Sequence, residues 1–156
     1  MKKNAVITSA LENRISFQKN QSIDLNTWIF EKLNVDSNSK VLELCCGTGS
    51  QTAYFEKEIK LGFVVSIDIN KESVEKAKFN TKSKKIKFIV SELDNTDNYI
   101  NDNYDLIFSA YGFYYSKNPV ELHKKLKLSL NEKGRFVLVG PVLGNNIQLY
   151  NIVKSI

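Results

Sequence analysis

Short apolar segments alternate with helix-like segments along nearly the whole of this 156-residue chain. Such alternation is typical of a parallel sheet whose strands are joined by crossover helices. A chain of this length buries roughly two thirds of the surface that its unfolded form exposes, which is enough for one core. We therefore expect a single α/β domain, with a doubly wound, mostly parallel sheet and helices on both faces. Five strands are expected, over residues 41–44, 63–67, 86–90, 105–109 and 135–139.

The clearest helix precedes the last of these strands. Asn118 can cap its amino terminus, and Pro119 suits the first helical position, where its missing N–H costs nothing. Gly134 then provides the turn into the strand that follows. The apolar stripe of this helix consists of leucines spaced four residues apart, namely Leu122, Leu126 and Leu130.

Helical spacing also predicts crossover helices over residues 50–60 and 71–80, and a last helix over residues 145–156. An amphipathic helix with Ser22 as its cap precedes the first strand. Its inward residues, and those of the helix over 71–80, are expected to be Leu25, Trp28, Ile29 and Leu33, and Val74 and Ala77. We divide the chain into a helical segment at 1–34, a ligand-binding core at 35–140 and a final helical segment at 141–156.

The strongest functional signal follows the first strand. Glu43 lies near the end of that strand, and Gly47 and Gly49 follow within residues 45–49, which we term the glycine turn. Glycines let a ligand approach the backbone, and the next helix offers free N–H groups. A carboxylate among apolar residues is costly unless it is paired, and a ligand ammonium group would pair with it. The alternative is a simple strand-to-helix turn in which Glu43 accepts backbone hydrogen bonds.

Asp68 is the second signal, because it ends the next strand about twenty residues after the glycine turn. A carboxylate in that position can accept hydrogen bonds from both hydroxyls of a ribose. A terminal aspartate is often just the cap of the following helix, and here Asn70 competes for that role.

Together these residues resemble the first motifs of the class I S-adenosylmethionine-dependent methyltransferases, whose fold is Rossmann-like. Their first motif runs acidic-x-Gly-x-Gly-x-Gly, and Glu43, Gly47 and Gly49 match it, with Cys45 where the first glycine is usual. A Leu-Cys-Cys-Gly-Thr-Gly variant is familiar within the family. The resemblance implies that the two glycines and the backbone around Cys45 hold the methionine part of the cofactor, and that Asp68 holds its ribose.

The resemblance extends over roughly residues 35–140, and its later motifs are less specific. Glu92 stands at the acidic position of the adenine-contacting segment, and Leu93 would contact adenine through its backbone. Ser109 begins the segment that runs beneath the methionine and faces the acceptor. Ile69, next to Asp68, belongs to the same implied cofactor set. The implied reaction is methyl transfer from S-adenosylmethionine, with S-adenosylhomocysteine as product; no catalytic residue and no metal site are identified.

One departure from the family concerns the end of the sheet. The family sheet normally finishes with two further strands, the last of them antiparallel, whereas this sequence stops after one helical segment beyond the fifth strand. We expect either a fragment of a longer protein or an exposed edge strand that a partner covers, since open edges invite association. A homodimer through that edge is one such arrangement.

Three rival functions share parts of this pattern. A dinucleotide oxidoreductase requires Gly-x-Gly-x-x-Gly, yet counting from Gly47 its third glycine position is Thr52. A nucleic-acid methyltransferase is encouraged by the net charge of +5 and the lysines of residues 78–87. Amine-methylating enzymes of that kind carry an Asn/Asp/Ser-Pro-Pro-aromatic segment, whereas Ser109 is followed here by Ala110 and Tyr111. A non-catalytic module that binds S-adenosylmethionine is the third rival. We favour a small-molecule acceptor.

The remaining features concern the cellular compartment and the surface residues of the protein. No apolar run approaches the roughly 18 residues of a membrane span, and we expect a cytoplasmic protein. Adjacent Cys45 and Cys46 argue against a disulfide framework and suit a reducing compartment. His123 is expected on the surface of its helix. Four aromatic residues either line an acceptor site or pack the connection after the fourth strand: Tyr111, Phe113, Tyr114 and Tyr115.

Overall fold

The computed structural model describes residues 8–9, 12–13, 16, 24–100 and 102–141. Its centre is a five-stranded sheet with the order β3-β2-β1-β4-β5, in which every neighbouring pair is parallel. The five expected strands are all present, which confirms the doubly wound α/β class. They are β1 (Lys40–Leu44), β2 (Phe63–Asp68), β3 (Ile86–Val90), β4 (Tyr104–Ala110) and β5 (Leu130–Val139).

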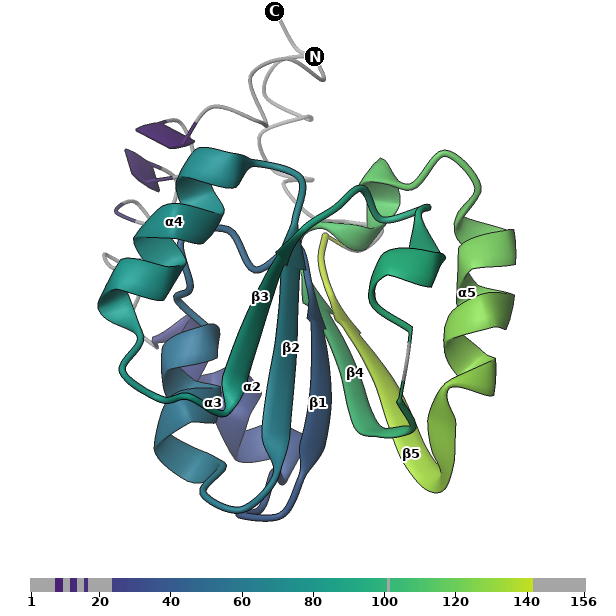
Figure 1. Ribbon diagram of the computed structural model, residues 1–156, viewed down its shortest axis with the longest axis horizontal. Helices are drawn as coiled ribbons and strands as arrows, with labels where there is room; N and C mark the ends of the chain where they lie inside the picture. Colours follow the sequence, from purple (N-terminus) through teal and green to yellow (C-terminus); the bar gives the residue numbers. More distant parts are fainter. Residues whose placement is uncertain (1–7, 10–11, 14–15, 17–23, 101, 142–156) are drawn as a thin grey trace, which may run out of the picture.

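Helices cover the sheet from both sides, as Figure 1 shows. On one face lie α2 (Leu25–Leu33), α3 (Thr52–Glu58) and α4 (Lys71–Asn80), and on the other lies α5 (Pro119–Leu128). Two short 3-10 helices, η2 (Thr96–Asn98) and η3 (Phe113–Tyr115), lie in the connections before and after β4. None of the described helices is both long and apolar enough to cross a membrane.

Two apolar clusters fill the space between the sheet and the helices. Alternate side chains of a strand point to opposite faces, so the central strands contribute to both clusters. Ile29 of α2 and Phe55 of α3 pack on one face of the sheet. Leu122 and Leu126 of α5 pack on the other face with buried Tyr104. This burial holds the helices against the two faces of one sheet.

Helix caps account for where the helices begin. The side chain of Asn70 accepts a hydrogen bond from the Ser73 N–H at the start of α4, and that of Asn118 accepts one from the Glu121 N–H at the start of α5. Each cap satisfies an N–H that has no partner within the helix. The expected caps of both helices are therefore found, and Asp68 is left free of that role.

Several local expectations need correction. Asp24 caps α2, and the expected cap Ser22 lies outside the described residues, as does the helix expected over 145–156. Trp28 is 47% exposed, since the buried residues of α2 are Ile29 and Leu33 and Trp28 lies outside the face that they form.

The connection from α5 to β5 also differs from the expectation. Leu130 does not extend the helical stripe; it is the first residue of β5 and pairs with Tyr104. The next pair is Leu106 with Arg135, so β5 carries extra residues there and Gly134 lies within that irregularity rather than before the strand. A Cβ on Gly134 would lie 2.7 Å from the carbonyl oxygen of Tyr104, which explains why glycine is needed at this position.

The order in which strands are added to the sheet reverses between β1 and β4, although the two strands are parallel. From β1 the sheet grows outward through β2 and β3 on one side and through β4 and β5 on the other. Ligands of open α/β sheets bind outside the carboxyl ends of the strands at such a switch point. Leu44 pairs with Ile67 of β2 and Ser109 of β4, so the connections that follow these strands start side by side.

Candidate functional site

The glycine turn has an unusual backbone. Cys45, Gly47 and Gly49 all have positive φ angles, of 59°, 55° and 88°. Left-handed conformations cost L-residues roughly 1–2 kcal/mol, whereas glycine adopts them freely. Glycine is needed at Gly49 for a second reason, because a Cβ there would lie 3.0 Å from the Cβ of Ala77 in α4. The turn thus presents bare backbone at the carboxyl end of the central strand.

Glu43 is buried within β1, directly before this turn. Its Oε2 accepts hydrogen bonds from the hydroxyls of Thr52 and Ser66, each at 2.6 Å. Burial raises the pKa of Glu43 to about 7, although both hydrogen bonds oppose that shift. The partners of this carboxyl group are therefore side chains of α3 and β2, not the backbone of the turn.

Asp68 joins the end of β2 to the glycine turn. Its Oδ2 accepts the N–H of Gly47 at 2.8 Å, and its Oδ1 accepts the N–H of Asn70 at 2.8 Å. Burial raises the pKa of Asp68, and the backbone N–H donors counteract the shift. Ile69, the neighbour in the implied cofactor set, is 53% exposed at the same end of the sheet.

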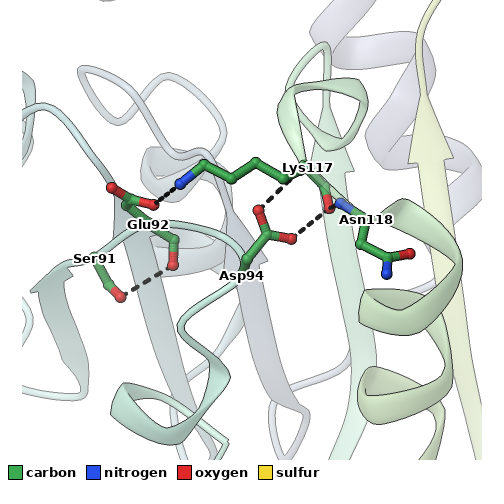
Figure 2. Close-up of polar contacts among 6 residues, drawn as sticks. Ser91, Glu92, Asp94, Lys117 and Asn118 are labelled. Atoms are coloured by element: carbon green, nitrogen blue, oxygen red, sulfur yellow. Dashed lines mark hydrogen bonds and ion pairs between the residues drawn. The ribbon is translucent and has the colours of Figure 1, made fainter.

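Residues 91–94, which we term the β3 loop, are attached to the segment that precedes α5. Figure 2 shows Lys117 extending from that segment to Glu92, and the Lys117 Nζ lies 2.8 Å from Oε2 of Glu92. Oδ1 of Asp94 accepts the Ser116 hydroxyl at 2.5 Å, and Oδ2 accepts the backbone N–H of Lys117 at 2.9 Å. Leu93, between the two acidic residues, is buried.

Ser109 ends the buried part of β4 and is 1% exposed. Its Oγ is the one buried side-chain nitrogen or oxygen without a hydrogen-bond partner among the residues that the structure describes. Buried hydroxyls are normally bonded, so this oxygen marks a place where a donor or acceptor is expected. Gly112 lies next to it, and a Cβ on Gly112 would be 3.5 Å from the Ser109 Oγ and 2.3 Å from the Cβ of Cys45.

Residues 111–118, which we term the aromatic segment, follow β4 at this end of the sheet. Tyr111 has a positive φ of 57°, a conformation that costs a bulky residue energy. Tyr114 and Tyr115 are exposed and their ring centroids lie 4.6 Å apart. Phe113 instead packs against Phe136 at 5.2 Å. Of the four aromatic residues singled out in the sequence, the partly buried Phe113 packs against the core and the other three are exposed.

Neither thiol has the character of a nucleophile. Burial, reinforced by the negative charges of Asp68 and Glu43, raises the pKa of Cys45 far above its usual range, and burial raises that of Cys46 as well. Both cysteines are free. His123 is exposed on α5, as expected, and its ring lies 5.4 Å from that of Phe136.

The candidate residues lie at one end of the sheet, but only some of them contact one another. The turn residue Gly47 is bonded to Asp68, and Cys45 approaches Gly112 beside Ser109. Glu92 contacts none of these; its partner is Lys117. Lys117 and Ser116 were not singled out in the sequence, because isolated polar residues before a helix cap carry no motif. The site combines a bare backbone turn, the buried carboxyl group of Glu43, the half-buried carboxyl group of Asp68 and a hydroxyl without a partner among the described residues.

Comparison with known proteins gives this arrangement a context. A family model described as a methyltransferase domain matches residues 35–155. Demethylmenaquinone methyltransferase of Staphylococcus saprophyticus is 34% identical over 76 residues, which are 46% of this chain and 30% of that enzyme. This chain therefore spans less than a third of that relative's length.

Solved structures share the fold. A putative methyltransferase in a complex with the Haloferax volcanii Trm112 methyltransferase activator has a TM-score of 0.75 at 19% identity, covering 95% of this chain and 64% of that chain. Coclaurine N-methyltransferase, solved with N-methylheliamine and SAH, has a TM-score of 0.66 at 17% identity, covering 76% of this chain and 37% of that one.

Proposed function

Because this chain belongs to the methyltransferase domain family, we propose that it transfers a methyl group from S-adenosylmethionine to a small-molecule acceptor. The observation that carries the proposal is the glycine turn. Cys45, Gly47 and Gly49 are all left-handed there, and Asp68 holds the turn by its bond to the Gly47 N–H. A turn built in this way offers backbone that a ligand can approach within contact distance.

The side chains around the turn suit the three parts of this cofactor. Glu43 has both hydroxyl donors on Oε2, which leaves Oε1 to accept a hydrogen bond from an ammonium group. Asp68 and exposed Ile69 would meet the ribose, and Glu92 and the backbone of Leu93 would meet the adenine. These last two assignments rest on their motif positions and on the common end of the sheet.

The orphaned hydroxyl of Ser109 supports the same placement, because it lies beside the glycine turn and lacks a partner among the described residues. When bound, the cofactor supplies a methyl group already activated by the positive sulfonium. The protein's contribution is then alignment of the acceptor and exclusion of water. No side chain is assigned as a base.

The aromatic segment supports a flat or cationic acceptor. Tyr111, Tyr114 and Tyr115 are exposed after β4, on the side of the sheet end where Cys45 and Ser109 lie. Aromatic faces bind flat rings by stacking and cations by their quadrupole. This arrangement favours a small acceptor that lies against the tyrosines.

The lysines that favoured a nucleic-acid acceptor lie elsewhere. Lys84, Lys85 and Lys87 border a cavity together with Phe63 and Tyr104, which are the first residues of β2 and β4. They are therefore at the amino end of the sheet, opposite the glycine turn. A polyanion held by these lysines would lie far from the methyl donor, which supports the small-molecule proposal.

Calorimetric titration with S-adenosylhomocysteine tests the proposal. Binding with one site per chain is expected, because the glycine turn is already formed. Absence of binding to the folded chain would contradict the cofactor assignment. Transfer of a radiolabelled methyl group to members of an acceptor panel of flat aromatic and amine compounds then separates an enzyme from a module that only binds the cofactor.

A further inference from the structure

The β3 loop and the aromatic segment are joined by one carboxylate. Asp94 accepts the hydroxyl of Ser116 and the backbone N–H of Lys117, while the N–H of Asn118 donates to the Ser116 Oγ at 3.1 Å. The side chain of Asn118 in turn caps α5. Asp94 thus holds Ser116 and Lys117 directly and Asn118 through Ser116, and Figure 2 shows its carboxylate directed toward the segment of Lys117 and Asn118.

Asp94 keeps its charge in this position. Burial acts against its ionisation, but the hydrogen bonds from Lys117, Ser116 and Asn118 outweigh that effect and the pKa of Asp94 is lowered. An ionised carboxylate accepts hydrogen bonds only, and such charge-assisted bonds are about twice as strong as neutral ones. The hydrogen bonds that attach the aromatic segment to Asp94 are therefore stronger than bonds between neutral groups would be.

The other end of the aromatic segment is also held. The N–H of Tyr111 donates to the carbonyl oxygen of Val139 in β5 at 2.7 Å. The next residue, Gly112, is buried against Cys45 of the glycine turn. The segment that carries the exposed tyrosines therefore contacts the methionine side of the proposed site through Gly112 and the adenine side through Asp94.

We propose that Asp94 is a positioning residue that couples occupancy of the cofactor site to the order of the aromatic segment. The proposal rests on the proposed function, since it takes the β3 loop as the adenine side of the site. Glu92 would contact the adenine, buried Leu93 links it to Asp94, and Asp94 holds Ser116 and Lys117. Fixing the β3 loop then fixes the segment against which the acceptor lies.

Neighbouring contacts make Asp94 the stronger of the two links. The ion pair between Lys117 and Glu92 joins side chains that are 74% and 53% exposed, and exposed pairs contribute little. On the other side of the loop, the Tyr99 hydroxyl donates to the carbonyl oxygen of Leu93 and the Tyr104 hydroxyl donates to that of Tyr99 at 2.9 Å. These buried bonds anchor the backbone of the β3 loop at Leu93, next to Asp94.

Amide hydrogen exchange with and without saturating S-adenosylhomocysteine tests the coupling in the wild-type chain, in Asp94→Asn and in Ser116→Ala. The matched control is Asp97→Asn, an exposed aspartate of η2 in the same connection. In the wild type and the control, the ligand should slow exchange in both residues 45–49 and 112–117, the latter at least about fivefold. In the two test variants the ligand should slow exchange in residues 45–49 as it does in the wild type, but in residues 112–117 by clearly less, because one of the two attachments of the aromatic segment is weakened.

Unchanged protection of residues 112–117 in both test variants would overturn the role of Asp94, as would a wild-type chain in which the ligand protects only residues 45–49. A wild-type chain protected nowhere would overturn the cofactor proposal itself, which is a different result. Protection of β1 and β4 without ligand verifies folding in every variant. Ser116→Ala removes one bond and leaves the acidic loop intact, so it remains informative if Asp94→Asn does not fold.

Discussion

The backbone N–H of Gly47 donates a hydrogen bond of 2.8 Å to the carboxylate of Asp68, across 21 residues of sequence. The bond joins the connections after β1 and β2, so the carboxylate that would bind a ribose also supports the turn that would hold the methionine. Each carboxylate oxygen of Asp68 accepts one backbone N–H and can accept a further hydrogen bond. Loss of this one side chain therefore affects both parts of the proposed site.

Replacing Asp68 by Ala should weaken the binding of S-adenosylhomocysteine. The loss should be about 1.5 to 3 kcal/mol, because charge-assisted hydrogen bonds are removed. Calorimetric titration measures it, with Asp97→Ala as the control on an exposed aspartate of η2. An affinity equal to that of the wild type, in a variant with native circular dichroism, would remove Asp68 from the site.

Replacing Gly47 by Val should abolish ligand binding and lower stability. A β-branched residue at a φ of 55° is strained by roughly 1–2 kcal/mol, and its side chain would fill the space that the ligand approaches. The control is Gly140→Val, because a Cβ on Gly140 would meet nothing within 4 Å. Thermal unfolding and calorimetric titration should show lower stability and no ligand binding for Gly47→Val, and neither effect for Gly140→Val. Retained binding in Gly47→Val would contradict a close approach of the ligand to the backbone.

Glu43 should make stability depend on pH. Because its pKa is raised from 4.5 to about 7 in the folded chain, ionisation disfavours the folded state, and its contribution to stability falls as pH rises through that interval. The size is on the order of 3 kcal/mol, since one pKa unit corresponds to about 1.4 kcal/mol. Urea unfolding at pH 5 and pH 8 should show a larger decline for the wild type than for Glu43→Gln.

The same residue offers a test of the ammonium pairing. A ligand ammonium group stabilises the ionised carboxyl group, so binding of S-adenosylhomocysteine near pH 7 should release protons from Glu43. Titration in buffers of different ionisation enthalpy measures this release. The proton release that comes from Glu43 should be absent in Glu43→Gln. If both proteins release the same number of protons on binding, the ammonium group does not pair with Glu43.

Cys45 and Gly112 should behave as a coupled pair. Replacing Gly112 by Ala would place a Cβ 2.3 Å from that of Cys45, so we expect a loss of about 1–3 kcal/mol of stability. Adding Cys45→Gly should recover most of that loss, because it removes the clash and relieves a left-handed residue. Denaturant unfolding of the four proteins of this cycle measures the coupling; additive effects would show that the two sites are independent.

Replacing Ser109 by Ala should weaken ligand binding without lowering the stability of the fold. Removing a buried hydroxyl that lacks a partner in the described part of the chain leaves stability unchanged or raises it by about 1 kcal/mol. The same change should weaken ligand binding if that hydroxyl contacts the cofactor. Buried Ser129, whose hydroxyl donates to the Leu126 carbonyl, is the control: Ser129→Ala should lower stability and leave binding unaffected.

Local sequence patterns predicted most of the fold. The strand β3 and the helix α4 have the expected bounds, because their apolar spacing and the cap Asn70 are all encoded within a few residues. Trp28 and Gly134 were misread where the local pattern allows two arrangements. Trp28 fits a helical stripe by spacing alone, and a glycine marks a bulge as readily as a turn.

The site was predicted in its local part only. The glycine turn is a motif of adjacent residues, and its left-handed backbone follows from them. The bond between Ser116 and Asp94, and the approach of Gly112 to Cys45, join residues far apart in the chain. Such contacts depend on which strands become neighbours, and a single sequence carries no direct record of that.

The central place of β1 has a consequence for how this protein folds. Every strand pair is parallel, and the glycine turn meets Asp68 from one half of the sheet and Gly112 from the other. Parallel pairings close long loops, and the binding surface is complete only when β1 is paired with β2 on one side and with β4 on the other. A bound nucleoside would therefore slow unfolding while leaving the folding rate unchanged, and the chain would gain kinetic stability only after both halves have docked.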